Sequence, residues 1–347
     1  MKILYAIQGT GNGHLSRSMD IVPILQKKGE VDILVSGVQG DLTLPFPVKH
    51  QFKGLSFIFG KSGGVDMYNT FIKLKSKRLY NEIKQLPIEE YDLVINDFEP
   101  VSAWACYAAN KPCISLSHQA AVISSKSPKP SKFDPIGQMI LRYYAPTTDQ
   151  YGFHFERYGK NIFTPVIRQQ IRDAQIADFG HYTVYLPAYD DERILKSLLR
   201  FEDIQWQVFS KHNKEPIIEK NVRILPIQNE LFVKSMATST GVICGAGFET
   251  PAEALFMGKK LLVVPMKGQY EQHCNAAALK QLGVPVIKSL KKKHMPVIEE
   301  WLANNKRIEV DYPDITERII DQLLAKFQPK ELNSFDIAKK WEKELNS

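Results

Sequence analysis

Short apolar runs alternate with amphipathic stretches along the whole chain of 347 residues. Apolar runs of four to eight residues bounded by glycine or proline are typical of buried strands, and apolar positions spaced three or four apart are typical of helices. The strands predicted in the first half lie at 2–7, 31–36, 91–96, 112–116 and 163–168, with a strand pair and turns at 47–59. The helices predicted between them lie at 14–28, 67–85 and 100–110.

The second half repeats the same alternation. Its predicted strands lie at 181–186, 205–209, 222–225, 241–244 and 260–265, and its predicted helices at 190–200, 229–238, 248–257 and 271–282. Residues 124–135, rich in Ser, Lys and Pro, and the polar segment 168–180 follow neither period. Such repetition predicts an α/β protein built from parallel sheets with helices on both faces, and ligands of these folds bind beyond the carboxyl ends of the strands.

The chain length predicts two domains, because about 150 residues make one domain on average. We place the boundary in the polar segment, which gives an N-terminal Rossmann-like domain at 1–174 and a C-terminal one at 175–330. A last helix, within 331–347, follows a break at Pro329 and is expected to pack back on the first domain. The predicted site lies between the two domains.

Composition narrows the class of protein without naming a function. The chain is 44% hydrophobic and 24% charged, which is ordinary for a globular protein, and it has no uncharged apolar stretch of the roughly 18 residues that a membrane span requires. The apolar run at 2–7 is too short for a signal peptide and the four cysteines form no CxxC pair, so we expect a cytoplasmic protein without disulfides or a structural zinc. The net charge of +7 favours anionic partners such as phosphates or an acidic membrane surface, and no nucleic-acid motif accompanies it.

A glycine-rich loop follows the first predicted strand and opens the first predicted helix. It consists of Gly9, Thr10, Gly11, Asn12 and Gly13. Its glycines permit close backbone approach, and amides at a helix start attract anions. The spacing is G-x-G-x-G, no acidic residue ends the second predicted strand, and no G-x-x-x-x-G-K-[ST] occurs anywhere, so neither NAD binding nor a P-loop is indicated.

His14 comes directly after this loop, in the first turn of the helix. Histidine is the usual general base near neutral pH, and its position predicts a side chain that faces the cleft. Asp97 ends a neighbouring predicted strand, where it is placed to accept a hydrogen bond from His14 and to stabilise the imidazolium. The alternatives are a capping or packing role for His14, and for Asp97 an N-cap of the helix that begins near Pro100.

The most informative stretch is 241–276. Its strand leads through Gly245, Ala246 and Gly247 to a helix start, where exposed amides and the helix dipole favour a phosphate. Thr250 adds a hydroxyl in the first turn, and Glu253, near it on the helix, is placed to accept hydrogen bonds from ribose hydroxyls. Glu271 and Gln272 follow the next strand as a clamp for sugar hydroxyls. The alternative is an ordinary strand-to-helix turn.

Segment 241–276 resembles the nucleotide-diphosphosugar signature of GT-B glycosyltransferases, the superfamily of the MurG-like N-acetylglucosaminyltransferases and of the UDP-glucuronosyl and plant UDP-glycosyl transferases. The loop 9–14 resembles the MurG-type loop G-G-T-G-G-H, with Gln8 in place of its first Gly and Asn12 as an additional residue. Together with the domain pattern, the resemblance covers nearly the whole chain. It implies the GT-B fold, two Rossmann-like domains facing across a cleft.

The resemblance also implies roles for particular residues. Thr250 matches the phosphate-binding Ser/Thr, Glu253 the ribose-binding Glu, and Glu271 with Gln272 the pair that holds the donor sugar before Asn275. His14 matches the base of many UDP-glycosyl transferases, and Asp97 resembles their dyad aspartate. Arg168 resembles an arginine near the MurG linker, and Ile227 lies about where the backbone contacts uracil.

Two residues depart from the pattern of the family. Glu249 stands where plant enzymes have Asn, and a carboxylate beside a diphosphate is costly unless it faces a cation or points away. Gly245 replaces a frequent His or Arg, so that the positive charge has to come from elsewhere, with Lys211, Lys267 and Arg168 as candidates. No D-x-D occurs in the chain, which agrees with a reaction that uses no metal and no other cofactor.

These observations predict an inverting, metal-independent transferase that moves GlcNAc or a hexose from a UDP-sugar to an acceptor hydroxyl. The alternatives are a UDP-sugar 2-epimerase or hydrolase of the same fold, and a nucleotide-sugar-binding regulator without turnover. The sequence does not specify the acceptor, which is either lipid-linked or a saccharide. Segment 70–80 carries four basic residues beside apolar ones, which fits either peripheral contact with an anionic membrane or a solvated helix face.

Overall fold

The computed structural model describes residues 1–37, 43–55, 59–60, 64–65, 76–132 and 134–327. The chain divides into one compact unit, Met1–Asp314, and a second unit that begins at Ile315. Helix α13 (Thr316–Leu324) is the helix that the structure describes in the second unit. Both sheets and the candidate site lie in the first unit.

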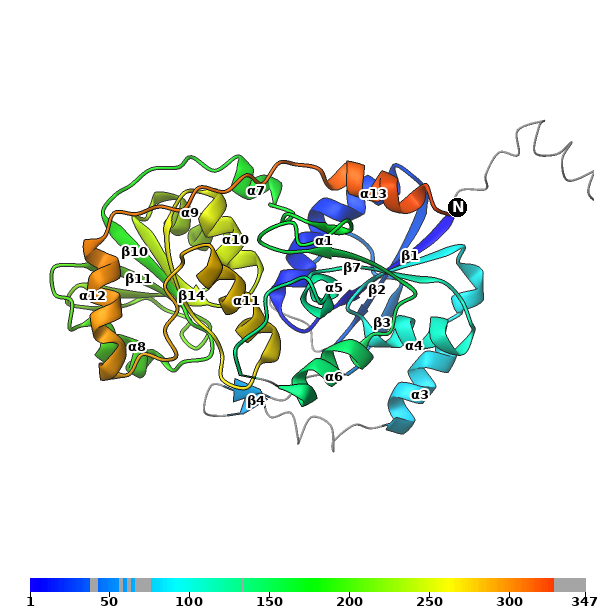
Figure 1. Ribbon diagram of the computed structural model, residues 1–347, viewed down its shortest axis with the longest axis horizontal. Coiled ribbons are helices and arrows are strands. Elements are labelled where there is room, and N and C mark those ends of the chain that lie inside the picture. Colours follow the sequence, from blue (N-terminus) through cyan, green and yellow to red (C-terminus); the bar gives the residue numbers. More distant parts are fainter. Residues whose placement is uncertain (38–42, 56–58, 61–63, 66–75, 133, 328–347) are drawn as a thin grey trace, which may run out of the picture. The chain divides into compact units, whose positions relative to one another are not determined.

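The first sheet has seven strands in the order β3-β2-β1-β6-β7-β8-β9, each parallel to its neighbours (Figure 1). In chain order they are β1 (Lys2–Gln8), β2 (Glu30–Ser36), β3 (His50–Phe52), β6 (Leu93–Asp97), β7 (Cys113–Ser117), β8 (Asp149–Phe153) and β9 (Ile162–Phe163). A short ribbon of β4 (Phe59–Gly60) and β5 (Gly64–Val65) stands apart from this sheet. Strands buried on both faces read as continuous apolar runs, which is why the central strands were recognisable in the sequence.

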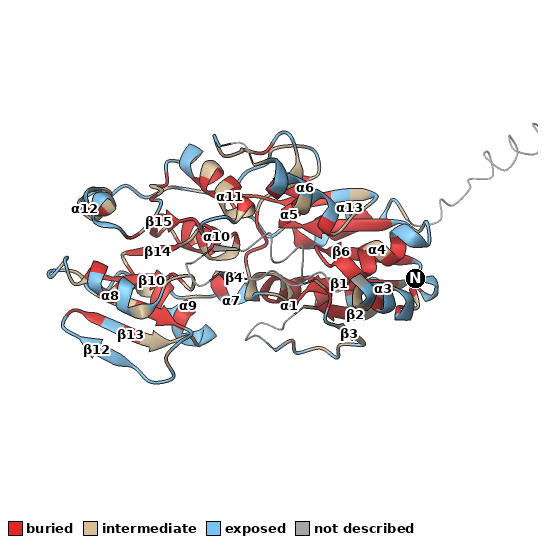
Figure 2. Cartoon of the chain, turned by 90° about the horizontal axis from the view of Figure 1, so that it is seen from below, coloured by how far each residue is buried: buried red, intermediate tan, exposed pale blue. Residues whose placement is uncertain are grey.

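Helices connect the strands of this sheet. They are α1 (Asn12–Gln26), α3 (Ser76–Gln85), α4 (Pro100–Ala108), α5 (His118–Ile123) and α6 (Pro135–Tyr144), with a 3-10 turn η1 (Ile88–Glu90). Helix α7 (Gln169–Arg172) follows the last strand of this sheet. Leu4 and Ala6 of β1 pack in one cluster with Ala103 and Cys106 of α4. Parallel neighbours require such crossover connections, which bury the sheet between helices (Figure 2).

The second sheet has the order β12-β13-β11-β10-β14-β15, and every pair is parallel except β12 with β13. The strands are β10 (His181–Tyr185), β11 (Gln205–Ser210), β12 (Ile217–Glu219), β13 (Val222–Pro226), β14 (Gly241–Gly245) and β15 (Lys260–Val264). The helices are α8 (Asp191–Leu198), α9 (Asn229–Thr238), α10 (Glu249–Phe256), α11 (Tyr270–Gln281) and α12 (Met295–Ala303), with a 3-10 turn η2 (Lys292–His294).

Alternate residues of β10 show that helices cover both faces of the second sheet. Tyr182 and Val184 belong to a core cluster with residues of α8 and α12. Thr183 lies on the other side, where its hydroxyl shares a 2.7 Å hydrogen bond with Ser235 of α9. Because side chains of a strand alternate between the two faces of its sheet, these contacts place α8 and α12 opposite α9.

The strand order of each sheet reverses beside its first strand, and this determines where a ligand can bind. In the first sheet β1 lies between β2 and β6, and in the second sheet β10 lies between β11 and β14. A crevice opens at the carboxyl ends of the strands where the order reverses. The glycine loop follows β1, Asp97 ends β6 and Gly245 ends β14, so the sequence motifs lie at these two crevices.

The structure confirms the predicted α/β class and most of the predicted elements. The strand predicted at 163–168 is wrong beyond Phe163, because residues 164–168 form no strand pairs. Among the elements that were not predicted are β8, β12, α5, α6, α7, α12 and α13. The last helix predicted within 331–347 and most of the basic segment 70–80 lie outside the described residues. Among the helices described, none is long and apolar enough to span a bilayer.

A glycine in β8 determines how closely α5 approaches the first sheet. A Cβ atom on Gly152 would lie 2.5 Å from the backbone nitrogen of Ala121 and 2.8 Å from its Cβ. Gly152→Ala is therefore expected to lower the free energy of unfolding by about 1–3 kcal/mol, the usual cost of overpacking, in urea denaturation. The matched control is Gly159→Ala, whose Cβ would have its nearest neighbour at 3.5 Å; equal stability of the two variants would contradict the prediction.

Candidate active site

One cavity of about 540 Å³ brings the two crevices together. Residues of the glycine loop, His14, Arg17 and Gln119 line it from the first half of the chain. Residues of the second half line it with the start of α10 and the start of α11. A concave site with a few converging polar groups is the usual form of a small-molecule site.

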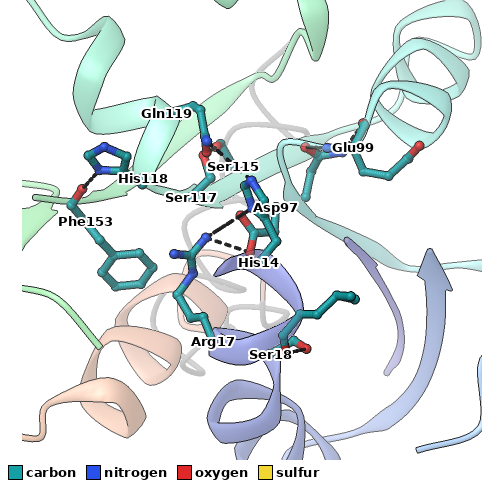
Figure 3. A network of polar contacts seen from close by, with 12 residues as sticks. His14, Arg17, Ser18, Asp97, Glu99, Ser115, Ser117, His118, Gln119 and Phe153 are labelled. Atoms are coloured by element: carbon teal, nitrogen blue, oxygen red, sulfur yellow. Dashed lines mark hydrogen bonds and ion pairs between the residues drawn. The ribbon is translucent and has the colours of Figure 1, made fainter. Parts of the chain in front are cut away.

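His14 and Asp97 form a hydrogen-bonded pair at the edge of this cavity (Figure 3). His14 Nδ1 lies 2.9 Å from Asp97 Oδ1, and the aspartate side chain is fully buried. Burial raises the pKa of Asp97, but the charge of Arg17 and the contacts with His14 outweigh it, so the pKa lies below its ordinary value of 3.8. An ionised carboxylate only accepts hydrogen bonds, so His14 carries its proton on Nδ1 and presents Nε2 as the basic nitrogen.

The amide of Gln119 is the nearest group to that nitrogen. Gln119 Nε2 lies 3.4 Å from His14 Nε2 and donates a 3.0 Å hydrogen bond to Glu271 Oε2. Gln119 comes from α5, directly after β7, and Glu271 comes from the first turn of α11. The basic nitrogen therefore faces a junction between the two halves of the chain.

Arg17 stands beside the pair and carries the positive charge nearest to it. It lies one turn after His14 on α1, and its Nη2 donates to both oxygens of Asp97 at 2.8 Å (Figure 3). Its Nη1 pairs with the carboxylate of Glu249 at the start of α10. Burial alone would lower the pKa of Arg17, but the charges of Asp97 and Glu249 raise it by more than burial lowers it. The guanidinium therefore stays charged, although only 2% of its side chain is exposed.

The turn after β6 shows that the alternative role of Asp97, as the N-cap of α4, is wrong. The N-cap of α4 is Glu99, whose carboxylate accepts hydrogen bonds from the amides of Val101 and Ser102, and not Asp97. Between them, Phe98 has a φ of 58°, which non-glycine residues rarely adopt, and its ring stacks on Tyr144 at 4.6 Å. Strained residues of this kind are frequent at functional sites.

The start of α10 forms the opposite wall. Gly247 and Thr250 line the cavity, and a Cβ on Gly247 would meet no atom within 4 Å, so a ligand can approach the backbone there. Ala246 lies beneath the surface, where its carbonyl accepts a 3.1 Å hydrogen bond from Asn275. Free amides in the first turn of a helix attract anions.

Glu253 lies one turn further along α10 and forms an ion pair with Arg168. Arg168 Nε and Nη2 lie 2.5 and 2.8 Å from the two carboxylate oxygens, and Nη1 donates to Asn229 at 2.9 Å. Burial lowers the pKa of Arg168, but the charge of Glu253 raises it above its ordinary value. Two residues that the sequence indicated separately thus hold each other in a bidentate pair.

The start of α11 completes the cavity. Gln272 uses its side-chain oxygen to accept a 2.8 Å hydrogen bond from the amide of Met266, which leaves its NH₂ group for other partners. Behind it, His118 lies 2.7 Å from Asn275 Oδ1 and 2.7 Å from the carbonyl of Phe153. These contacts attach α11 to the end of β7 in the other sheet.

Most residues indicated by the sequence line the cavity. They are Thr10, Gly11, Asn12, Gly13, His14, Arg168, Ile227, Gly247, Thr250, Glu253, Glu271 and Gln272. Gly9, Asp97, Gly245 and Ala246 support the walls, and Lys211 and Lys267, which were considered as sources of positive charge, are not among the lining residues.

Three residues of the site were not found in the sequence. Arg17 lies three residues after His14, on the same face of a helix, and Gln119 and His118 directly follow a predicted strand. The rule that singled out Asp97, a polar residue at the carboxyl end of a parallel strand, applies equally to His118 and Gln119. In the described part of the chain, no cluster of three or more His, Cys, Asp or Glu side chains is arranged to hold a metal ion.

Solved structures with a similar fold define the class of protein. MurG of Acinetobacter baumannii is similar with a TM-score of 0.56 at 13% identity, covering 93% of this chain and 99% of that one. UGT89C1 of Arabidopsis thaliana, solved in complex with UDP, is similar with a TM-score of 0.56 at 14% identity, covering 94% and 99%. The fold is that of the GT-B glycosyltransferases.

The sequence comparisons agree with this class. The profile of the family described as Glycosyl transferase family 1 matches residues 1–305, and the chain belongs to this family. A protein of Methanosarcina mazei named "Uncharacterized glycosyltransferase" is 23% identical over 322 residues, which cover 82% of this chain and 84% of that protein. The activity is therefore that of a glycosyltransferase, as the sequence predicted.

Proposed function

We propose that the chain transfers a sugar, GlcNAc or a hexose, from a UDP-sugar to an acceptor hydroxyl, with inversion at the anomeric carbon and without a metal ion. The observation that carries the proposal is the 2.9 Å hydrogen bond between His14 and Asp97, in a cavity whose other wall is the start of α10. A base on one wall and anion-attracting amides on the other are what a direct displacement requires.

In this proposal His14 Nε2 removes the proton of the acceptor hydroxyl as its oxygen attacks the anomeric carbon. Asp97 stabilises the imidazolium that forms, and Arg17 keeps that carboxylate ionised. The leaving diphosphate lies at Gly247–Thr250, where the first amides of α10 and the helix dipole balance its charge. Because one displacement inverts the anomeric configuration, the proposal requires no covalent intermediate.

UDP as the nucleotide rests on the resemblance and on one neighbour. UGT89C1 was solved with UDP, and Ile227 and Glu253 of this chain lie in the same cavity as the start of α10. Glu271 and Gln272, in the first turn of α11, are then placed to contact the sugar, as the resemblance implies. The side-chain oxygens of Asn12, Thr10 and Gln119 are buried and have no hydrogen-bond partner within the described residues.

A UDP-release assay tests the reaction. UDP-GlcNAc, UDP-glucose, a GDP-sugar and a dTDP-sugar are each incubated with a panel of saccharide and lipid-linked acceptors. We expect release from a UDP-sugar only, unchanged by EDTA, and a product with inverted anomeric configuration by NMR. A second arm without acceptor tests for 2-epimerisation, and UDP-ManNAc formed from UDP-GlcNAc in that arm would replace the transfer proposal with an epimerase.

The donor site is tested by Glu253→Ala. We expect calorimetric titration to show UDP binding weakened by about 1–3 kcal/mol, because ribose hydroxyls lose a buried acceptor. Titration of 2′-deoxy-UDP separates the contact between Glu253 and the ribose from an effect on Arg168. The wild type should bind 2′-deoxy-UDP more weakly than UDP, whereas Glu253→Ala should bind the two ligands equally well. The control is Glu192→Ala, on the exposed side of α8. An unchanged preference for UDP over 2′-deoxy-UDP in Glu253→Ala would refute this role.

A further inference from the structure

Glu249 occupies the place that the proposed function assigns to the donor diphosphate. It is the first residue of α10, it lines the cavity together with Gly247 and Thr250, and 17% of its side chain is exposed. A helix start attracts one anion, so a carboxylate and a diphosphate compete for the same amides. The sequence marked this residue as a departure from the family, and the structure shows that it faces Arg17.

The groups around Glu249 carry charges of both signs. Asp97 from β6, Glu253 from the next turn of α10 and the buried Tyr5 hydroxyl lie near it, against Arg17 and His14 of α1 and Arg168. Burial, assisted by Glu253 and Asp97 and opposed by Arg17 and His14, raises the pKa of Glu249 to about 7.

The neighbouring carboxylates have other partners than Glu249 has. Glu253 is held by two nitrogens of Arg168, and Asp97 accepts from both Arg17 and His14, which hold its pKa below the ordinary value. Glu249, in contrast, has a single cationic partner, and that partner is shared with Asp97. The third acidic residue of the cavity wall, Glu271, accepts a hydrogen bond from the neutral amide of Gln119.

The net charge of the cavity wall depends on whether Glu249 is ionised. Among the described residues, two arginines face four carboxylates: Glu249, Glu253 and Glu271 line the cavity, and Asp97 lies behind Arg17. Two negative charges are therefore in excess while Glu249 is ionised, and one when it is neutral. An incoming diphosphate is repelled less strongly by the second state than by the first. In the neutral state the charge of Arg17 is also no longer shared between two carboxylates, and Arg17 lines the cavity.

We propose that Glu249 couples donor binding to the uptake of one proton: the diphosphate binds at the start of α10 when the Glu249 carboxyl is neutral and Arg17 retains Asp97 alone as its ionic partner. This inference rests on the proposed UDP donor and adds a determinant of its binding. Donor binding then tightens as the pH falls through neutrality. His14 and Asp97 keep their own hydrogen bond in both states.

The first test is calorimetric titration of UDP into the wild type at pH 8 in two buffers with different ionisation enthalpies. UDP is fully ionised at this pH, so proton uptake reports on the protein. We expect uptake of about one proton per UDP at pH 8. This measurement needs no variant, and absence of uptake at pH 8 with normal UDP binding would overturn the inference.

The second test compares dissociation constants of the wild type and Glu249→Gln at pH 6 and pH 8. The neutral form makes up about nine tenths of the wild type at pH 6 and about one tenth at pH 8, so the wild type should bind about tenfold more weakly than the variant at pH 8 and about equally at pH 6. Using the ratio to the variant removes the ionisation of UDP itself. The matched control is Glu230→Gln, an exposed acidic residue in the first turn of α9, which should behave like the wild type.

The outcomes separate the two proposals. If UDP binds, but the ratio of the dissociation constants of the wild type and Glu249→Gln does not change with pH, the role of Glu249 is overturned and the proposed function stays in place. Failure of UDP to bind the wild type at either pH overturns the donor assignment, and this inference with it. A ratio that rises at pH 8 together with proton uptake supports both.

Discussion

His14→Ala is expected to lower kcat by about 10²- to 10⁴-fold, the usual contribution of a general base, while UDP binds as tightly as to the wild type. The imidazole lies on the wall formed by α1, and the proposed diphosphate contacts come from α10, so that removing the ring should affect the chemical step and not donor affinity. UDP release with the best acceptor of the panel gives kcat, and calorimetry gives the dissociation constant.

His212→Ala serves as the control, because His212 is exposed and does not line the cavity. A His14→Ala enzyme with wild-type kcat would show that another group removes the proton. A variant that loses UDP binding as well would show that the ring contributes to the donor site, which contradicts the division of roles between the two walls.

Arg17→Met is expected to lower the free energy of unfolding by about 3–5 kcal/mol in urea denaturation, because two carboxylates would lose their common buried partner. Asp97 would retain only its hydrogen bond from His14, and Glu249 would have no cation bound to it. The control is Arg200→Met, at an exposed position after α8, which is expected to change stability by less than about 0.5 kcal/mol.

The pH dependence of this loss has a definite sign. In the wild type, Asp97 has a pKa below 3.8, so its ion pair stabilises the fold above that pH and the contribution is lost as acid protonates it. In Arg17→Met both carboxyls have higher pKa values, so the deficit is largest at alkaline pH and shrinks as they become neutral. Adding Glu249→Gln to Arg17→Met should recover part of the stability. A deficit that grows on acidification would contradict this account.

Most of the residues that could be recognised in the sequence lie between the end of a buried strand and the first two turns of the helix that follows it. His14, Gly247 and Thr250 were found in this way, because a short apolar run followed by glycine is visible locally. The same rule was not applied to His118 and Gln119, which follow β7. Strand β8 was missed because it is short and only its last three residues are buried. Helix α6 does have apolar positions at helical spacing and was overlooked between the Pro-rich segment and the aromatic stretch that follows it.

The partnerships within the site could not be read from the chain. Arg168 and Glu253 are 85 residues apart and were interpreted separately in the sequence. Arg17 and Glu249 are 232 residues apart, and Arg17 was not singled out at all. Arg168 was considered as a counter-charge for phosphate, whereas the structure commits it to Glu253. Spacing along a sequence contains no information on which of several distant charges share one cavity wall.

The sequence by itself determined the class of the fold, most of its strands and helices, and the loops that carry the chemistry, because periodicity and glycine placement are local properties of the chain. Only the tertiary structure decided which charges neutralise one another: it placed Glu249 against Arg17 and Glu253 against Arg168. The physical reason is that a pKa depends on burial and on every charge within a few ångströms, and these neighbours come together only when the sheets and their helices pack.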